Sequence, residues 1–279
     1  VDGALAEGAW AAAPWHGDFT SASAGAENSG RPRPAAVQTR FKVLYDAGTL
    51  YVGVECDEPK PEGIRAAATE HDGMTFTDDC VEIFFDPEGE ARYYQHFAIN
   101  TLGAWYDDFS ADYGLVHGKL WDCPIQAAAK VNAADKRWTL EVKLPFGALA
   151  LGAKPGSAWA WNVTRERYAG GTQELTSWAP LKGSFHAPRL FGKLAGLDVD
   201  YRRFALAVAE PSASVSGGSS GVRQVTVRTR LTNHTPAEQT LAGTLSLFGR
   251  AEPVAHAEKV TLKPGADVEV AFPALAVRG

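Results

Sequence analysis

The sequence predicts an all-β protein made of two successive β-sandwiches. Short runs rich in aromatic and β-branched residues recur along the chain, and each is bounded by Gly, Pro, Asp or Asn, as strands are. No amphipathic pattern of three helical turns accompanies them. All eight tryptophans lie at or before Trp178, so the composition changes along the chain. Many strands with few helices favour a sandwich or barrel.

The expected strands of the first part are, in chain order, FKVLYD, LYVGVEC, VEIFFD, QHFAIN, RWTLEVKLPF and WAWNVTRERY. The run RWTLEVKL shows the pattern most clearly. Its apolar residues Trp138, Leu140, Val142 and Leu144 alternate with the polar residues Arg137, Thr139, Glu141 and Lys143. A period of two predicts that the apolar residues face a core and the polar ones face water.

The second part begins after FGKLAGLDVDYRR, where tryptophan is no longer used. Its expected strands are ALAVAE, RQVTVRTRLTN, GTLSLFG, EKVTL and DVEVAF. We therefore expect a first sandwich over residues 1–198 and a smaller, immunoglobulin-like sandwich over 199–279. The stretch SASVSGGSSG is expected to be a loop within the second.

Composition excludes several classes of partner. The chain of 279 residues is 45% apolar, carries a net charge of −6 and has no basic cluster, which argues against nucleic acid. No apolar run reaches the roughly 18 residues of a membrane span. Because the chain begins without Met, we expect it to be joined to further domains. The three cysteines, an odd number without a CxxC pair, are expected to be buried free thiols.

The segment FTDDCVEIFF gathers three carboxylates, Asp78, Asp79 and Glu82, around one predicted strand. On a strand, Asp79 and Glu82 would face opposite ways, and Asp78 would stand about 13 Å from Glu82. Glycosidases need two carboxyl groups roughly 5–5.5 Å or roughly 6.5–9.5 Å apart. The segment alone therefore does not predict a catalytic pair, and we expect no enzyme, although a second carboxylate from elsewhere in the chain stays open.

The same alternation predicts a polar face instead. Glu82 and Asn100 can share the sheet face that points away from the main core, among aromatic residues. Fixed donors and acceptors beside aromatic rings suit a sugar, whose hydroxyls and C–H face they match. The alternative is that Glu82 pairs with a buried arginine such as Arg165.

The order of segments from VDGALAEGAW through FTDDCVEIFFDP and RWTLEVKLPFGAL to FGKL resembles the family 9 carbohydrate-binding modules, over residues 1 to about 198. This resemblance implies a β-sandwich that binds an oligo- or polysaccharide without chemistry. It also implies attachment to a bacterial glycoside hydrolase or another exported polysaccharide-handling protein, and an extracellular or periplasmic location.

The resemblance also implies a set of site residues. Two aromatic residues clamp a terminal sugar in the family, and Phe76 and Phe185 stand at those positions. Glu82 and Asn100 match the family's polar contacts, whereas Ala98 replaces an arginine. Lys182 is a polar residue near the second clamp position, and Trp105 is a loop aromatic that could extend the groove. The expected sugar-binding residues are therefore Phe76, Glu82, Asn100, Phe185, Lys182, Trp105 and Arg165.

Three other interpretations stay open. Structural calcium is common in the family, and Asp107, Asp108 and Asp112 offer oxygen ligands, but they lack an Asp-x-Asp-x-Asp-Gly pattern, so no metal site is located. Related sandwiches hold haem b, for which Met74 could pair with His71, His96 or His186. Finally, the first sandwich could be a structural or docking module without a ligand, since fold alone never defines function.

Overall fold

The computed structural model describes residues 1–22, 32–111, 116–118, 121–150, 153–154, 156–181, 183–204, 206–217, 222–235, 237–245, 254–256 and 259–278. The chain divides into two compact units, Val1–Val199 and Asp200–Gly279. This division lies one residue beyond the boundary expected from the sequence. Among the described residues, no helix is long and apolar enough to cross a membrane.

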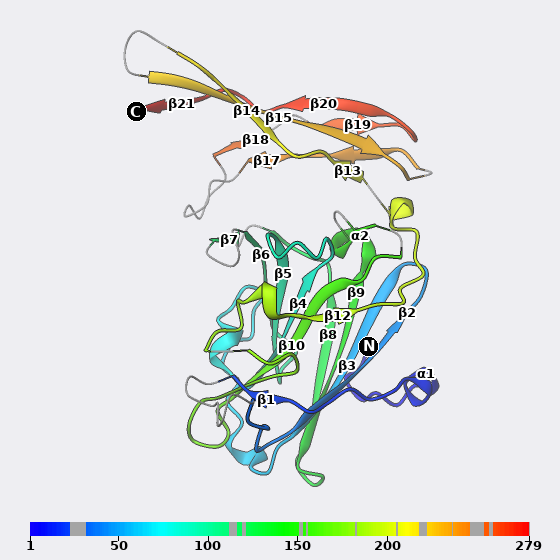
Figure 1. Cartoon of the computed structure of the whole chain (residues 1–279), viewed down its shortest axis with the longest axis vertical. Coiled ribbons are helices and arrows are strands. Elements are labelled where there is room, and N and C mark those ends of the chain that lie inside the picture. Colours follow the sequence, from blue (N-terminus) through cyan, green and yellow to red (C-terminus); the bar gives the residue numbers. More distant parts are fainter. Residues whose placement is uncertain are drawn as a thin grey trace. The chain divides into compact units, whose positions relative to one another are not determined.

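Two antiparallel sheets build the first unit (Figure 1). The larger sheet has the order β1-β11-β10-β4-β5-β6-β7, with β12 also paired to β10. Its strands are β1 (Thr20–Ser21), β4 (Cys80–Asp86), β5 (Tyr94–Asn100), β6 (Trp105–Ala111), β7 (Val116–Gly118), β10 (Trp159–Arg167), β11 (Glu174–Ser177) and β12 (Gly192–Leu194). The smaller sheet has the order β2-β3-β9-β8. Its strands are β2 (Thr39–Tyr45), β3 (Thr49–Asp57), β8 (Gln126–Asn132) and β9 (Arg137–Pro145).

The helices of the described residues are short. The α-helices are α1 (Gly8–Ala12) and α2 (Phe146–Leu149), and the 3₁₀ helices are η1 (Pro61–Gly63), η2 (Thr75–Thr77), η4 (Pro188–Leu190) and η5 (Tyr201–Phe204). The all-β fold class predicted from the sequence is thus confirmed. Of these short helices, η2 matters most for the site, because it carries Phe76 to the beginning of β4.

The two sheets pack face to face around an aromatic core. Phe41 of β2 meets Trp161 of β10 edge-on, with ring centroids 5.1 Å apart, and Trp161 stacks on Phe85 of β4 at 5.8 Å. The apolar residues of β9 that were predicted to face the core, such as Trp138 and Leu140, are fully buried. This core covers one face of β4 and β10, and the side chains on their opposite face point away from it.

The opposite face of β9 differs from the prediction at Glu141, which is buried rather than exposed to water. The N-terminal segment covers it. The Glu141 carboxylate accepts hydrogen bonds from the backbone N–H of Asp2 at 2.9 Å and from the indole N–H of Trp10 at 3.3 Å. Alternation on a strand cannot show that a distant segment will cover its polar face.

The cysteines Cys56, Cys80 and Cys123 are free and buried, as expected. Burial raises the pKa of Cys56 to about 11 and that of Cys123 to about 12. The thiolate, which is the reactive form, is therefore scarce at neutral pH. These thiols serve as small packing groups.

The second unit is also built from strands. A five-stranded sheet contains β13 (Leu206–Val208), β14 (Ser212–Ser216), β15 (Val222–Asn233), β20 (Asp267–Ala271) and β21 (Leu275–Arg278). Two further pairs are β16 (Gln239–Leu241) with β19 (Val260–Leu262), and β17 (Thr244–Leu245) with β18 (Ala255–His256). An immunoglobulin-like connectivity and independent folding of the units stay predictions.

The predicted loop SASVSGGSSG is wrong in its first half, which forms β14. Ser212–Ser216 pair antiparallel with β15, residue for residue from Ser212 opposite Arg228 to Ser216 opposite Gln224. Serine is a weak strand former, but pairing with a long neighbour overrides that local preference. Residues 218–221 of this stretch lie outside the described part of the chain.

Candidate functional site

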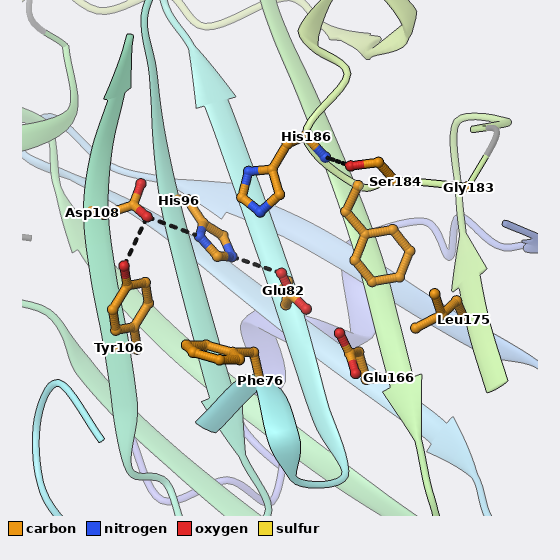
Figure 2. Close-up of a pocket in the computed structure, with 11 residues that line it drawn as sticks. Phe76, Glu82, His96, Tyr106, Asp108, Glu166, Leu175, Gly183, Ser184 and His186 are labelled. Atoms are coloured by element: carbon orange, nitrogen blue, oxygen red, sulfur yellow. Dashed lines mark hydrogen bonds and ion pairs between the residues drawn. The ribbon is translucent and has the colours of Figure 1, made fainter. Parts of the chain in front are cut away.

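A pocket of about 400 Å³ opens on the outer face of the larger sheet, away from the aromatic core. Side chains from β4, β5, β6, β10, β11 and η2, together with a short loop before η4, form its wall (Figure 2). The lining residues are Phe76, Glu82, His96, Tyr106, Asp108, Glu166, Leu175, Gly183, Ser184, Phe185 and His186.

Strand register explains why the charged residues meet here. His96 of β5 lies opposite Phe84 of β4 on one side and opposite Asp108 of β6 on the other. Glu82 precedes Phe84 by two residues on β4, so both side chains point to the same face. Three neighbouring strands therefore contribute Glu82, His96 and Asp108 to one row, which we call the charged row.

The charged row is joined by short contacts. The His96 Nε2 atom lies 2.7 Å from an oxygen of Glu82, and its Nδ1 atom lies 3.6 Å from an oxygen of Asp108. Tyr106 and Ser110 donate hydrogen bonds to Asp108 at 2.9 Å and 2.7 Å. The imidazole is also fixed from above its plane, because it stacks on Phe84 with centroids 4.5 Å apart.

The two carboxylates keep His96 charged. Burial by itself would lower the pKa of His96, but Asp108 and Glu82 outweigh burial and raise this pKa to about 9. The imidazole is therefore a cation at neutral pH and neutralises one of the two acids beside it. A buried charge of this kind is stable only when it is paired.

Glu166 brings a further acid into the pocket from β10. In Figure 2 its carboxyl group lies close to that of Glu82, on the neighbouring strand. One of its oxygens accepts hydrogen bonds from the Tyr168 hydroxyl and the Gln173 amide, both at 2.9 Å. Burial and the adjacent Glu82 raise the pKa of Glu166 to about 7.

Aromatic rings complete the pocket. Phe76 on η2 is half-buried and meets Tyr106 edge-on, with centroids 5.4 Å apart. Phe185 is 6% exposed and packs in an apolar cluster with Phe84 and Phe191. The structure thus brings together Phe76, Glu82 and Phe185, three of the residues expected from the sequence. Their contact with a sugar stays a prediction.

Asn100 does not line this pocket. It shares the strand face with Glu82, as expected, but its amide closes the turn after β5. Its Nδ2 atom donates to the carbonyl of Ala68 at 2.8 Å and to Asp78 at 3.0 Å, and its oxygen accepts from the N–H of Leu102 and of Ala104. With these contacts made, the side chain is part of the framework, which corrects the sequence-based expectation.

Arg165 also lies elsewhere. It points to the face of β10 opposite to Glu166 and is 1% exposed. Its guanidinium pairs with Glu58 at 3.0 Å and donates to the Asp57 carbonyl at 2.8 Å. The alternative that Glu82 pairs with Arg165 is therefore wrong, because Glu82 pairs with His96.

The remaining expected residues fall outside the pocket or outside the described residues. Trp105 begins β6 and packs on the ring of His71 at 5.0 Å, away from the pocket lining. Lys182 lies outside the described part of the chain, as does Asp112 of the proposed calcium ligands.

The acids that precede Glu82 organise loops. Asp78 and Asp79 are fully buried. Asp78 accepts hydrogen bonds from the N–H groups of Ala67 and Ala68, both at 2.9 Å. Asp79 accepts from the N–H of Arg65 at 2.8 Å and also binds backbone N–H groups after β10. The cluster read from FTDDCVEIFF thus divides into two framework acids and one pocket acid.

Neither the expected calcium ligands nor the haem ligands form a matching set among the described residues. Asp107 already binds His71 at 2.7 Å and the N–H of Cys123 at 2.7 Å, and Asp108 belongs to the charged row. Met74 is 63% exposed and does not line the pocket that holds His96. Met74 therefore does not share this pocket with His96 or His186, as an axial ligand paired with either would.

The sequence does not indicate that Glu166 lines the pocket or which residues contact Glu82. The run WAWNVTRERY indicates a strand, and alternation along it places Glu166 and Arg165 on opposite faces. What the sequence does not show is that β10 lies beside β4, with Thr164 opposite Glu82. Pairing across strands separated by some 80 positions is decided by the whole sheet.

The fold and this pocket define a sandwich domain with a polar, aromatic-lined binding site. Residues 1–196 match the model of the Carbohydrate family 9 binding domain-like family, and the chain belongs to this family. No curated protein matches the chain significantly.

Solved structures with a similar fold include family 9 carbohydrate-binding modules of Caldicellulosiruptor kristjanssonii. The module in complex with glucose is 16% identical, with 72% of this chain and 90% of that chain covered and a TM-score of 0.49. The module in complex with cellotriose is 17% identical, with 70% and 87% covered and a TM-score of 0.47.

Proposed function

We propose that the first unit is a carbohydrate-binding module that grips the end of a sugar chain between Phe76 and Phe185. The observation that carries this proposal is the pocket itself, in which acidic and imidazole side chains lie among aromatic rings. Family membership over residues 1–196 supports the same function.

The chemistry of the pocket suits a sugar ring. Hydroxyl groups need fixed acceptors, which Glu82 and Glu166 supply, and the C–H face of the ring packs against aromatic side chains. The pocket volume of about 400 Å³ lies within the range of roughly 300–1,000 Å³ that holds small ligands. One or two sugar units fit such a space.

The wider setting is also proposed. As a module, the chain would belong to a larger exported protein that handles polysaccharides, in the extracellular or periplasmic space. Its role there would be to hold the attached protein near a carbohydrate. The family to which residues 1–196 belong supports this setting.

We expect weak but saturable sugar binding, with a Kd of about 1 mM, which corresponds to about −4 kcal/mol. A phenyl ring offers less contact area than an indole and no N–H donor, and Ala98 offers no charged group. Calorimetry of the full chain against glucose, glucosamine, galactose, xylose, cellobiose and cellotriose measures this. Absence of saturable binding across the panel would contradict the proposal and favour a structural or docking role.

We also propose that the domain is not a catalyst. Glu82 and Glu166 lie close to each other on neighbouring strands, whereas glycosidases hold their two carboxyl groups roughly 5–5.5 Å or roughly 6.5–9.5 Å apart on either side of the bond that is cleaved. Aryl glycosides should therefore be hydrolysed no faster than in buffer. Turnover that survives repurification and disappears in Glu82→Gln would show that this expectation is wrong.

A further inference from the structure

The pocket holds more acids than bases. Among its described lining residues, three carboxyl groups, those of Glu82, Asp108 and Glu166, accompany two imidazoles, those of His96 and His186. His96 lies between Glu82 and Asp108 and contacts both. The excess of negative charge therefore falls at Glu166 and the side of Glu82 that faces it.

Among the described residues, the side chains that donate hydrogen bonds to Glu166 carry no positive charge. The groups that donate to it, the Tyr168 hydroxyl and the Gln173 amide, are neutral. The carboxyl group of Glu82 also lies close to it on the neighbouring strand. Two adjacent carboxylates without a shared cation repel each other, and one of them holds a proton more firmly as a result.

Within the described part of the chain, the other titratable groups around Glu166 do not pair with it, and the cation Arg65 lies over the ring of Tyr168 at 5.3 Å. From β4, β5, β6, β10 and the loop before η4, the groups that face it or its row are Cys80, Glu82, His96, Tyr106, Asp108, Tyr168 and His186. The Cys80 thiol and the two tyrosines are neutral near pH 7, because burial raises the pKa of each above its ordinary value. Nδ1 of His186 lies 2.7 Å from the hydroxyl of Tyr94, a residue of β5, the strand on the other side of β4 from β10.

We propose that this pocket selects sugars that carry a free ammonium group, and that the ammonium binds between the carboxylates of Glu82 and Glu166. The inference rests on the proposed function and names the sugar class that the site prefers. An ammonium has three N–H donors, enough to reach both carboxylates, and its hydrogen bonds to them are charge-assisted. The ring of Phe76, which lines the same pocket, offers an aromatic face that can attract a cation.

Sugars without a free ammonium group match this pocket less well. A neutral sugar such as glucose offers hydroxyl donors but leaves the two carboxylates in repulsion. An N-acetylated amino sugar has the nitrogen but no charge, and its acetyl group takes up space. A uronic acid adds a further negative charge to an acidic pocket. The proposal therefore predicts a definite order of affinity among sugars of equal size.

Proton release is an independent sign of the same binding mode. With its pKa at about 7, Glu166 carries a proton in most molecules at pH 6. An ammonium beside it favours the ionised form, so binding at pH 6 should expel close to one proton and affinity should rise from pH 6 to pH 7. A neutral sugar that used the protonated form would show the opposite pH dependence.

The test is calorimetry of the full chain with glucosamine, glucose, N-acetylglucosamine and glucuronic acid, at pH 6 and pH 7, in buffers of different ionisation enthalpy. Glucosamine should bind about tenfold more tightly than glucose, a difference of about 1.4 kcal/mol. In Glu166→Gln, which keeps the shape and removes the charge, this preference should fall below about threefold and proton release should stop. Glu62→Gln, which removes an exposed charge outside the pocket, is the matched control and should behave as the unsubstituted chain does.

The outcomes separate the two proposals. If glucose binds as tightly as glucosamine, the inference is overturned and the proposed function stands. If no sugar binds, both are overturned. If Glu166→Gln keeps the full preference for glucosamine, the assignment to Glu166 is wrong. Should that variant fail to fold, proton release by the unsubstituted chain still decides the question, because its absence at pH 6 contradicts the proposal.

Discussion

Replacing Glu58 by glutamine is expected to lower the free energy of unfolding of the first unit by about 3 kcal/mol. Glu58 is fully buried just after β3 and binds two arginines of β10, Arg165 at 3.0 Å and Arg167 at 2.7 Å. It therefore joins the two sheets through the interior. Glutamine keeps the shape of the side chain but leaves the buried guanidinium of Arg165 without a carboxylate, whereas Arg167 keeps Glu174 at 2.6 Å. An uncompensated buried charge is strongly destabilising.

A surface triad with the same composition provides the control. Glu55 also binds two arginines, Arg40 at 2.6 Å and Arg137 at 3.2 Å, but both arginines are well exposed. Since exposed ion pairs contribute less than about 1 kcal/mol, Glu55→Gln should change stability little. Denaturant unfolding followed by tryptophan fluorescence reports on the first unit alone, because all eight tryptophans lie in it. Equal effects of the two substitutions would contradict the prediction.

The effect of Glu58→Gln should also depend on pH. Burial alone would raise the pKa of Glu58, but hydrogen bonds from Arg167 and the N–H of Lys60, with the charge of Arg165, outweigh it and lower this pKa. A lowered pKa stabilises the folded state above the ordinary glutamate pKa, and this stabilisation is lost as pH falls through the lowered value. The difference between variant and unsubstituted chain should therefore shrink in acid.

Phe76→Ala is expected to weaken sugar binding at least tenfold, or about 1.4 kcal/mol. The side chain is half-buried, lines the pocket and is held edge-on against Tyr106. Its removal takes away one of the two apolar surfaces proposed to contact the sugar ring. Calorimetry with the sugar that binds best to the unsubstituted chain measures the loss.

Phe109→Ala is the matched control, because Phe109 is also half-buried in the larger sheet but does not line the pocket. Phe185→Ala should weaken binding too, yet Phe185 is buried in an apolar cluster, so this variant also loses about 3 kcal/mol of stability. Phe76 is thus the cleaner test. Sugar affinity that is unchanged in Phe76→Ala would remove Phe76 from the site.

The sequence predicts features that depend on a residue's own strand better than roles that depend on neighbouring strands. Alternation along single strands predicts the buried residues of β9 and the face on which Glu82 lies. The order of motifs predicts Phe76 and Phe185 at one pocket. Roles that depend on neighbours across the sheet are not predicted. Asn100 binds backbone groups of a turn, Arg165 pairs with Glu58, and Glu166 lies in the pocket. The role of each residue depends on the segments that lie beside it in the fold.

The charged row has a consequence for how the larger sheet assembles. If β5 slipped by one residue against β4 and β6, His96 would turn into the aromatic core and Phe97 would turn toward Glu82 and Asp108. Such a misaligned sheet would bury an unpaired imidazole on one side and leave two carboxylates without their cation on the other. The three side chains that shape the pocket therefore also favour the correct register of β4, β5 and β6, because that register brings His96 into contact with both carboxylates.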